Sequence, residues 1–406
     1  MPVRLDQIPA VALRPARPRV WHWFGLLLLF LLLGLGASFL FGTPQQTVSF
    51  WGPALGIPFL SWCVLSFGQA VLYLGQHRAA DGWDEAREDD LIQSVRQGRR
   101  SQQLLHVSLH SAFRVQGEQP IAQLEALLGK TEALKAQPAR LSDGALRHSR
   151  VGGDSNEAPE IVLLQALTDV LADLAKTLAL LPDDTPLALL LEVNSALPEN
   201  TLRRVWRQAW SDSGIRQNSE PVEGTGLAAL DLWLDHRIND QALLFVVALQ
   251  FAPEQPEGTA EVVVGLLLGN RLTQTTLPPM AYLHRPEQER DVSRDGLANA
   301  ARQALDWASP DAESIEHVWR VGIDPQRTFA INAVLAELPL PAKPNQRIYN
   351  LDFSLGHPGK ASPWVAIVAA AQKIQNGAGA QFVFSGDDVA AEIWTTVVTP
   401  VSPLSK

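Results

Sequence analysis

The sequence has almost no cysteine, since Cys63 is the single one among 406 residues. One cysteine cannot form a disulfide framework, a cysteine-based zinc site or an iron–sulfur cluster, so all three are excluded. Basic residues are also in deficit, with 33 Lys and Arg against 43 Asp and Glu and a formal net charge of −10. A general nucleic-acid-binding surface needs clustered positive charge and is therefore not expected.

Charge is absent from one long stretch, because no Lys, Arg, Asp or Glu occurs between Arg19 and Arg78. Two apolar spans lie within it, at 21–41 and 51–74, and the polar run 42–47 separates them. Each span has roughly the 20 residues that a helix needs to cross a bilayer. The sequence therefore predicts two transmembrane helices over residues 20–77. A signal peptide or a pair of buried core helices would be the alternatives.

Positive charge flanks these spans on one side only. The connecting run carries none, whereas arginines precede the first span and follow the second at Arg4, Arg14, Arg17, Arg19, Arg78 and Arg87. The positive-inside rule then places the basic N-terminus, residues 1–19, and everything after residue 77 in the cytoplasm. Residues 78–100 form a charged connector that leads to a large cytoplasmic domain, residues 101–406.

That domain reads as alternating strands and helices. Apolar runs typical of buried strands occur at 104–109, 187–193, 242–251, 260–268, 317–321, 347–353, 381–384 and 393–398. Helical patterns occur at 160–181, 198–210, 226–236, 297–307, 326–338 and 362–374. This alternation predicts an α/β layered fold, and its order occurs twice, which indicates an internal duplication. Residues 135–159 are rich in Ser, Gly and Asp and predict a flexible loop.

Three segments of this domain resemble ketoacyl synthases of the thiolase-like superfamily, in the order that those enzymes have them. The helix start GLAAL, Gly226–Leu230, resembles the segment just downstream of their nucleophile. The run IEHVWRVG, Ile315–Gly322, resembles their strand that ends in an Ala-His-Gly-Thr loop. The run LGHPGKAS, Leu355–Ser362, resembles their Gly-His-x-x-Gly loop. The resemblance implies a thiolase-like fold of duplicated strand–helix units.

The same resemblance implies that the condensing chemistry is lost. The position of the cysteine nucleophile falls near Glu223, the first histidine falls on Val321, and the supporting lysine falls on Asp352. Only His357 matches. We therefore expect no condensing activity, no catalytic residue, no cofactor, no metal and a domain that is not an enzyme. The candidates for a remnant cleft are His357, Gly356, Gly359, Glu223 and Asp352.

A membrane hairpin joined to such a domain resembles accessory proteins of type VI secretion lipase toxins. This implies an adaptor in a bacterial inner membrane that binds a protein partner, either a secreted toxin or a spike protein. One alternative is a hydrolase or decarboxylase that acts on acyl-CoA or acyl-carrier substrates through His357. Another is a sensor of lipid or acyl ligands in the remnant cleft. A homodimer is also expected from the resemblance.

Other candidate residues favour structural roles. His106 and His110 lie in a predicted strand, which separates them by about 13 Å and argues against a shared metal. The adjacent acids Asp183-Asp184 and Asp387-Asp388 predict solvated turns, as does Asn376–Gly379. His357 has two interpretations, an anion site with the following helix N-terminus or a cap of its own turn. The 12 tryptophans fit either core packing or a protein interface.

Overall fold

The computed structural model describes residue 3 and residues 5–40, 48–115, 120–129, 132–152, 157–308, 315–338, 347–386 and 392–401. The predicted polar turn 42–47 and the acidic pair Asp387-Asp388 lie outside these residues. The chain divides into two compact units, residues 4–95 and residues 96–406, the latter together with residues 1–3. Each unit is described by itself.

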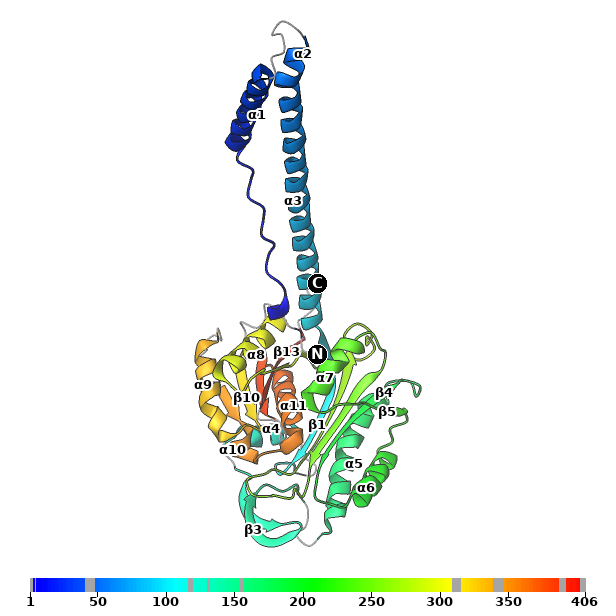
Figure 1. Cartoon of the computed structure of the whole chain (residues 1–406). Helices are drawn as coiled ribbons and strands as arrows, with labels where there is room; N and C mark the ends of the chain where they lie inside the picture. Colours follow the sequence, from blue (N-terminus) through cyan, green and yellow to red (C-terminus); the bar gives the residue numbers. More distant parts are fainter. Residues whose placement is uncertain are drawn as a thin grey trace. The chain divides into compact units, whose positions relative to one another are not determined.

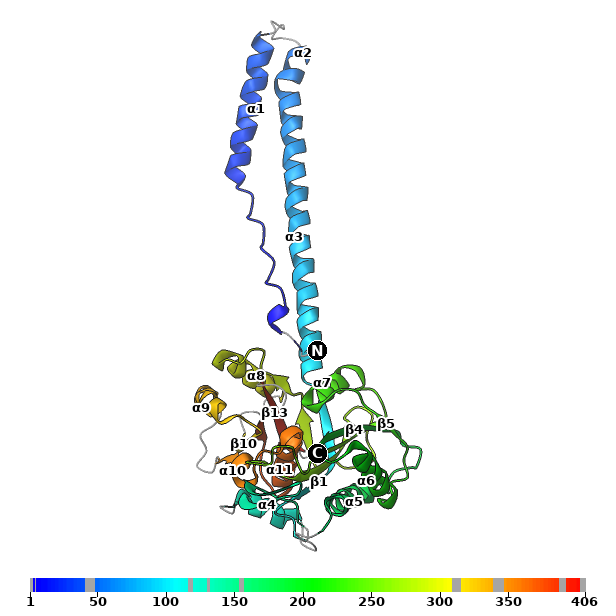
Figure 2. The ribbon, with the colours of Figure 1, turned by 60° about the horizontal axis from the view of Figure 1, so that its bottom comes forward.

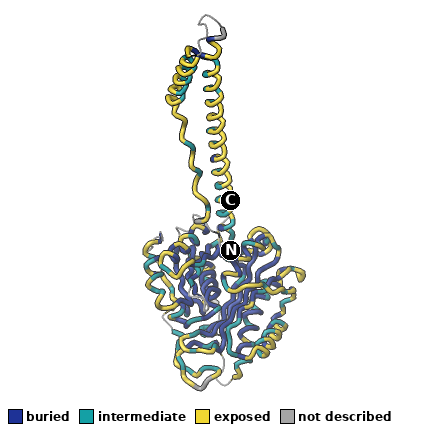
Figure 3. Tube along the Cα trace, in the orientation of Figure 1, coloured by how far each residue is buried: buried dark blue, intermediate teal, exposed yellow. Residues whose placement is uncertain are grey.

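The first unit is built on two long helices that contain the apolar spans (Figure 1). Helix α1 spans Val20–Leu40; the short helix α2, Val48–Trp51, and a π-helical turn, Gly52–Gly56, lead into α3, Ile57–Gly98. Both apolar stretches are long enough to cross a membrane, with mean hydropathies of 2.3 and 1.6. Only 6% and 0% of these windows are buried (Figure 3), whereas a core helix of a soluble protein is mostly buried. Helix α3 continues unbroken through the predicted connector.

Helix α1 packs against α3 and against the π-helical turn before it. The indole N–H of Trp62 donates a hydrogen bond of 2.8 Å to the carbonyl oxygen of Trp23. At Gly34, an added Cβ would overlap the side chain of Pro58 and the backbone of Ala54. A glycine is needed at this position because the two backbones approach closely, as small residues allow in membrane helix pairs.

The second unit contains a large mixed sheet. Its path runs in the order β11-β10-β12-β13-β8-β1-β7-β6-β4-β5. Its strands are β1 (Ser101–Ser111), β4 (Leu187–Asn194), β5 (Ser219–Pro221), β6 (Leu243–Gln250), β7 (Val262–Asn270), β8 (Ala281–His284), β10 (His317–Val321), β11 (Arg347–Asn350), β12 (Gln381–Gly386) and β13 (Ile393–Pro400). The two-residue strand β9, Glu287–Gln288, pairs with β13.

The sheet consists of two halves with the same topology. In the N-terminal half, β4 pairs in parallel with β5 and β6, and β7 then pairs antiparallel with both β6 and β1. In the C-terminal half, β10 pairs in parallel with β11 and β12, and β13 pairs antiparallel with β12 and β8. The halves join where β1 pairs antiparallel with β8. The predicted duplication is therefore confirmed in the strand order.

Helices cover both faces of this sheet. Helices α7 (Gly226–His236) and α11 (Ser362–Gln375) pack in one core with strands of both halves. On the opposite face, α5 (Pro159–Leu178) and α6 (Glu199–Asp212) cover the N-terminal half, while α8 (Arg294–Trp307) and α9 (Thr328–Glu337) cover the other (Figure 2). Helices are needed on both faces because the strands are apolar on both faces. In β6, Leu244 and Val246 face α7, whereas Phe245 and Val247 face α5.

The structure differs from the sequence reading in several elements. Residues 135–148, predicted as loop, form the hairpin of β2 (Lys135–Ala139) and β3 (Ser142–His148). The predicted strand 347–353 ends at Asn350, whose side chain accepts hydrogen bonds from the N–H groups of Asp352 and Phe353 and so begins helix α10 (Leu351–Leu355). The sequence patterns also predict no element at α4 (Pro120–Leu128), β5, β8 or β9.

Candidate functional site

A cavity of about 380 Å³ lies at the N-terminus of α7, beside the 3₁₀ turn Gly359–Ala361 (η5) that leads into α11. Its polar lining includes Glu192, Thr225, Lys360 and Ser385, and its apolar lining includes Leu227 and Trp394. Both halves of the sheet contribute to it. A concave site that combines apolar walls with a few polar groups is the usual form of a small-molecule site.

Glu192 is the acidic group of this cavity. It lies on β4, where Ala188 and Leu190 precede it on the side that faces α7 and α11. One carboxylate oxygen accepts the backbone N–H of Gly226, and the other accepts the indole N–H of Trp364 at 2.6 Å. Glu192 is only 5% exposed. Two donors therefore fix a buried carboxylate at the edge of the cavity.

The N-terminus of α7 favours an anion at this point. Thr225 is the N-cap residue, but its side chain makes no capping hydrogen bond. Gly226, with a φ of 54°, is the first helical residue, and Glu192 accepts its N–H in place of a cap. The first N–H groups of a helix lack internal acceptors and its dipole is positive there, so this carboxylate occupies a favourable position.

Lys360 is the cation among the described residues that line the cavity. It lies in η5, directly after Gly359, so the C-terminal half supplies the ammonium group and the N-terminal half supplies Glu192. Trp364, in the first turn of α11, is fully buried and donates a hydrogen bond to Glu192. The cavity thus holds a carboxylate, an ammonium group and a helix N-terminus together.

The structure places His357 beside this cavity rather than in its lining. Its Nδ1 accepts the backbone N–H of Gly359 at 3.1 Å, so the proton of the neutral ring lies on Nε2. Its carbonyl oxygen accepts hydrogen bonds from Ala260 N at 2.9 Å and from Gln250 Nε2 at 2.6 Å. Gly356 adopts a φ of 97°, which favours glycine. These contacts support the capping interpretation of His357.

Asp352 and Glu223 have different surroundings. The carboxylate of Asp352 accepts the N–H groups of Gly322 at 2.8 Å and Ile323 at 3.2 Å. Burial raises the pKa of Asp352, although these hydrogen bonds and the nearby His357 act in the opposite direction. Glu223 is exposed before α7. Among the described residues that line the cavity, none is one of the five predicted from the sequence.

Sequence reasoning missed Glu192, although the sequence carries a signal for it. The strand LALLLEVN alternates, and Glu192 occupies a position on the apolar side of that pattern. A charged side chain is almost never fully buried unless it is paired, so its presence on a core-facing position indicates a specific polar contact. The resemblance to ketoacyl synthases pointed instead to Glu223, in the loop before α7.

The two histidines of β1 have separate partners on α5. His106 Nδ1 lies 3.0 Å from the hydroxyl of Thr177, and His110 Nδ1 lies 3.6 Å from Asp169. Burial lowers the pKa of both histidines. The strand prediction is confirmed here. In the part of the chain that the structure describes, no group of three or more His, Cys, Asp or Glu is arranged to hold a metal.

Buried charge also gathers at the C-terminal end of α7. The guanidinium of Arg285 is fully buried and lies 2.6 Å from Asp231 and 2.7 Å from Asp235. Nearby, Glu287 accepts the indole N–H of Trp307 at 2.5 Å. Burial raises the pKa of Glu287 to about 7, and the Trp307 hydrogen bond opposes this shift. These residues form a structural ion-pair network and are not among the described residues that line the cavity, although Gln288, which follows Glu287 in β9, is one of them.

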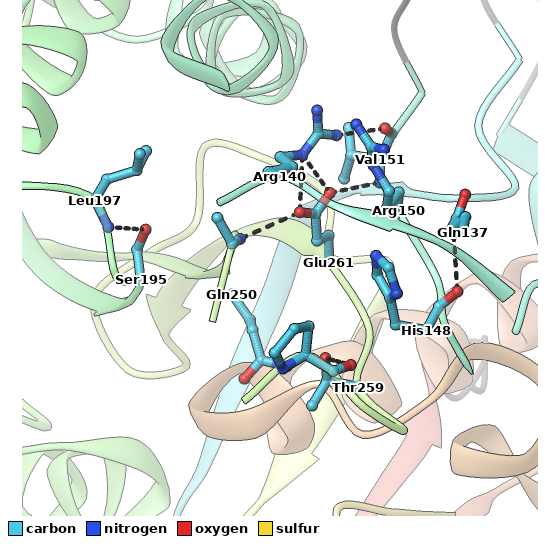
Figure 4. A network of polar contacts seen from close by, with 12 residues as sticks. Gln137, Arg140, His148, Arg150, Val151, Ser195, Leu197, Gln250, Thr259 and Glu261 are labelled. Carbon is cyan, nitrogen blue, oxygen red and sulfur yellow. Dashed lines mark hydrogen bonds and ion pairs between the residues drawn. The ribbon is translucent and has the colours of Figure 1, made fainter. Parts of the chain in front are cut away.

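A second buried ion pair holds the β2–β3 hairpin (Figure 4). Arg140, in the turn of the hairpin, donates from Nε to both oxygens of Glu261 at 2.8 and 2.9 Å. Glu261 also accepts the backbone N–H groups of Val151 and Ala252. The guanidinium stacks over the ring of Phe251 at 4.6 Å. Both charged side chains are almost fully buried.

Comparisons with known proteins support the fold. No family model and no curated protein matches the sequence. Among solved structures, a chain from a type II polyketide ketosynthase in complex with its acyl-carrier protein (AntDE:AntF) is 10% identical, with a TM-score of 0.52 over 75% of this chain and 100% of that chain. The ishigamide ketosynthase/chain length factor is 17% identical, with a TM-score of 0.50 over 74% and 100%. The PfaC ketosynthase–chain length factor is 11% identical, with a TM-score of 0.51 over 76% and 43%.

These findings correct one expectation. The sequence reading held that the domain is not an enzyme, because it lacks the family cysteine. The solved structures that share its fold are described as ketosynthases or ketosynthase–chain length factors, so the domain has an enzyme fold and that expectation is contradicted. The missing cysteine excludes one nucleophile only, and an ionisable group, Glu192, lies at the start of α7. The α/β unit of this chain has the thiolase-like fold of the ketosynthases.

Proposed function

We propose that the chain is a membrane-anchored hydrolase of acyl thioesters, carried either on coenzyme A or on an acyl-carrier protein. The observation that carries this proposal is Glu192, a carboxylate fixed between the N-terminal turns of α7 and α11 in a cavity that also holds Lys360. A ketosynthase structure of the same fold is a complex with an acyl-carrier protein, which suggests the substrate class.

In the proposed reaction, Glu192 acts as a general base toward water. Its carboxylate takes a proton while the water oxygen attacks the thioester carbonyl carbon. The negative charge that develops on the carbonyl oxygen is stabilised by Lys360 and by the N–H groups of Leu227 and Ala228 in the first turn of α7. The carbon–sulfur bond then breaks, and the proton held by Glu192 passes to the thiolate. The products are one carboxylic acid and one thiol.

Hydrolysis is favoured over decarboxylation by the charge of the site. A substrate for decarboxylation must bring its own carboxylate into the cavity, where it would meet Glu192. Two carboxylates in one partly desolvated site repel each other, and one cation cannot neutralise both. A neutral thioester has no such conflict. A fixed carboxylate can polarise the water molecule that hydrolysis needs.

The membrane part of the proposal rests on α1 and α3. Two exposed apolar helices with arginines on one side support insertion with both termini in the cytoplasm. The α/β unit would then act on substrates in the cytoplasm or at the membrane surface.

The test is a thioesterase assay on the full chain in detergent or nanodiscs, with short-chain to long-chain acyl-CoA and acyl-carrier substrates. We expect Glu192→Gln to lower kcat about 10²–10⁴-fold, the range for loss of a general base. The matched control is Glu125→Gln, which changes an exposed glutamate of α4. Thermal unfolding checks that each variant is folded.

Two outcomes would contradict the proposal. Absence of turnover with every thioester would exclude the activity. Turnover that survives in Glu192→Gln but disappears in His357→Ala would move the chemistry to the histidine, as the sequence-based alternative has it. Lys360→Met provides an independent check, because loss of the cation should lower kcat by a larger factor than it changes KM.

A further inference from the structure

Three exposed arginines lie at one end of the apolar helices, and we call them the arginine collar: Arg17, Arg19 and Arg78. Arg17 and Arg19 directly precede α1, and Arg78 follows the apolar part of α3. Within the described residues, none of the three has a carboxylate within 4.0 Å or a side-chain hydrogen bond. Their charges are therefore directed to solvent.

Carboxylates are available close by, which makes this pattern informative. Residues 81–90 of α3 contain six Asp or Glu and a single basic residue, Arg87. Asp81, one helical turn beyond Arg78, pairs instead with Arg14 at 2.9 Å. Asp84 accepts the backbone N–H of Ala12 at 2.8 Å. Among the described residues, the collar thus stays unpaired although Asp81 and Asp84, the nearest carboxylates along α3, pair with the N-terminal segment.

The position of the collar follows from contacts on both sides of it. Trp83 Nε1 donates to the carbonyl oxygen of Ala10 at 3.3 Å, and Arg87 Nε donates to that of Pro9 at 2.7 Å. Further along, Trp62 donates to Trp23. The N-terminal segment is therefore tied to α3 before and after Arg17 and Arg19. All three arginines lie where the apolar surface of the helix pair ends.

We propose that the arginine collar binds the phosphate groups of anionic phospholipids. Guanidinium groups pair with phosphate through two parallel hydrogen bonds, and the anionic headgroups of a cytoplasmic leaflet attract juxtamembrane arginines. The acidic segment next to the collar is repelled by the same headgroups, so lipid contact ends sharply at Arg78. This inference rests on the membrane anchoring in the proposed function and is independent of the hydrolase activity.

The experiment compares the full chain in nanodiscs of phosphatidylcholine with the full chain in discs that also contain phosphatidylglycerol. Native mass spectrometry measures the lipids that stay bound on release, and thermal unfolding measures stabilisation. The collar variant is Arg17→Gln, Arg19→Gln and Arg78→Gln together. The matched control removes three exposed arginines of the α/β unit, Arg203→Gln, Arg207→Gln and Arg216→Gln, and so makes the same change in net charge.

We expect the wild-type chain and the control to retain phosphatidylglycerol over phosphatidylcholine, with a preference that weakens as salt is added. In the collar variant, this preference should fall by about fivefold for each arginine removed. Equal retention of both lipids, or a collar variant that behaves like the control, would overturn the inference. Equal stabilisation by inorganic phosphate in lipid-free detergent would show a phosphate site rather than a lipid site and would also overturn it. Failure of the wild-type chain to insert into either disc would instead refute the anchoring.

Discussion

Substitution of Glu261 by Gln tests the buried ion pair of the β2–β3 hairpin. The two oxygens of Glu261 accept four hydrogen bonds, two from Arg140 and two from backbone N–H groups. Glutamine keeps one acceptor oxygen and places an N–H₂ group against donors, so Arg140 would remain buried with its charge uncompensated. Breaking a buried pair by removing one partner costs about 3–5 kcal/mol of unfolding free energy.

The measurement is urea unfolding of the full chain in detergent, followed by tryptophan fluorescence, with limited proteolysis of the hairpin as a second readout. We expect Glu261→Gln to be destabilised by about 3–5 kcal/mol and the hairpin to be cleaved faster. Combining it with Arg140→Met removes the orphaned charge, so the double variant should be more stable than the sum of the two single losses predicts, by about 1–3 kcal/mol. A single-variant loss below about 1 kcal/mol, or strict additivity, would refute the role assigned to this pair.

Two further predictions concern stability. Because burial raises the pKa of Glu287 from 4.5 to about 7, the folded chain holds a proton that the unfolded chain has lost. The contribution of Glu287 to the unfolding free energy is complete below pH 4.5 and falls by about 3 kcal/mol as the pH rises to 7. Glu287→Gln should remove this pH dependence. If urea unfolding gives the same pH profile for the variant and the wild-type chain, the raised pKa of Glu287 is contradicted. At Gly386, an added Cβ would overlap the carbonyl oxygen of Gly322, so Gly386→Ala should cost about 2–3 kcal/mol, while Gly144→Ala, where a Cβ meets nothing within 4 Å, should change the midpoint little.

Much of the fold could be predicted because its main elements carry strong patterns. Helix α7 begins at Gly226 and ends at His236, and β10 spans His317–Val321, both as predicted. In these segments the apolar residues recur with the period of one element, and glycine or polar residues mark the ends. The buried strands β6 and β7 are recognised instead as continuous apolar runs, because they are buried on both faces.

Elements that depend on distant contacts were the ones missed. Strand β8 has four residues, too few for a pattern, and it exists because it pairs with β1 and β13. The hairpin has the composition of a loop, but Arg140 is fixed by Glu261, which lies 121 positions away in the sequence. A local reading cannot anticipate an ion pair of that separation.

The candidate site was predicted in its region but not in its central residue. Motif order led to the start of α7 and to the loop of His357, and both adjoin the cavity. Glu192 reaches the helix from a neighbouring strand, so its distance from Gly226 in space is set by sheet packing. The protein partner, the secretion role, the inner-membrane location and the homodimer stay predictions.

The duplicated sheet has a consequence for how this sequence can change over time. Glu192 comes from the N-terminal half, whereas Trp364, which donates a hydrogen bond to it, comes from the C-terminal half. Directly after a duplication, the two halves of the sheet would have the same sequence. The hydrogen bond between Glu192 and Trp364 joins different residue types from the two halves, so the halves can no longer replace each other. A mutation of either residue leaves a buried polar atom of the other without its partner. Relatives of this chain should therefore change both residues together or neither. Such covariation would show in which half of the sheet the buried carboxylate arose.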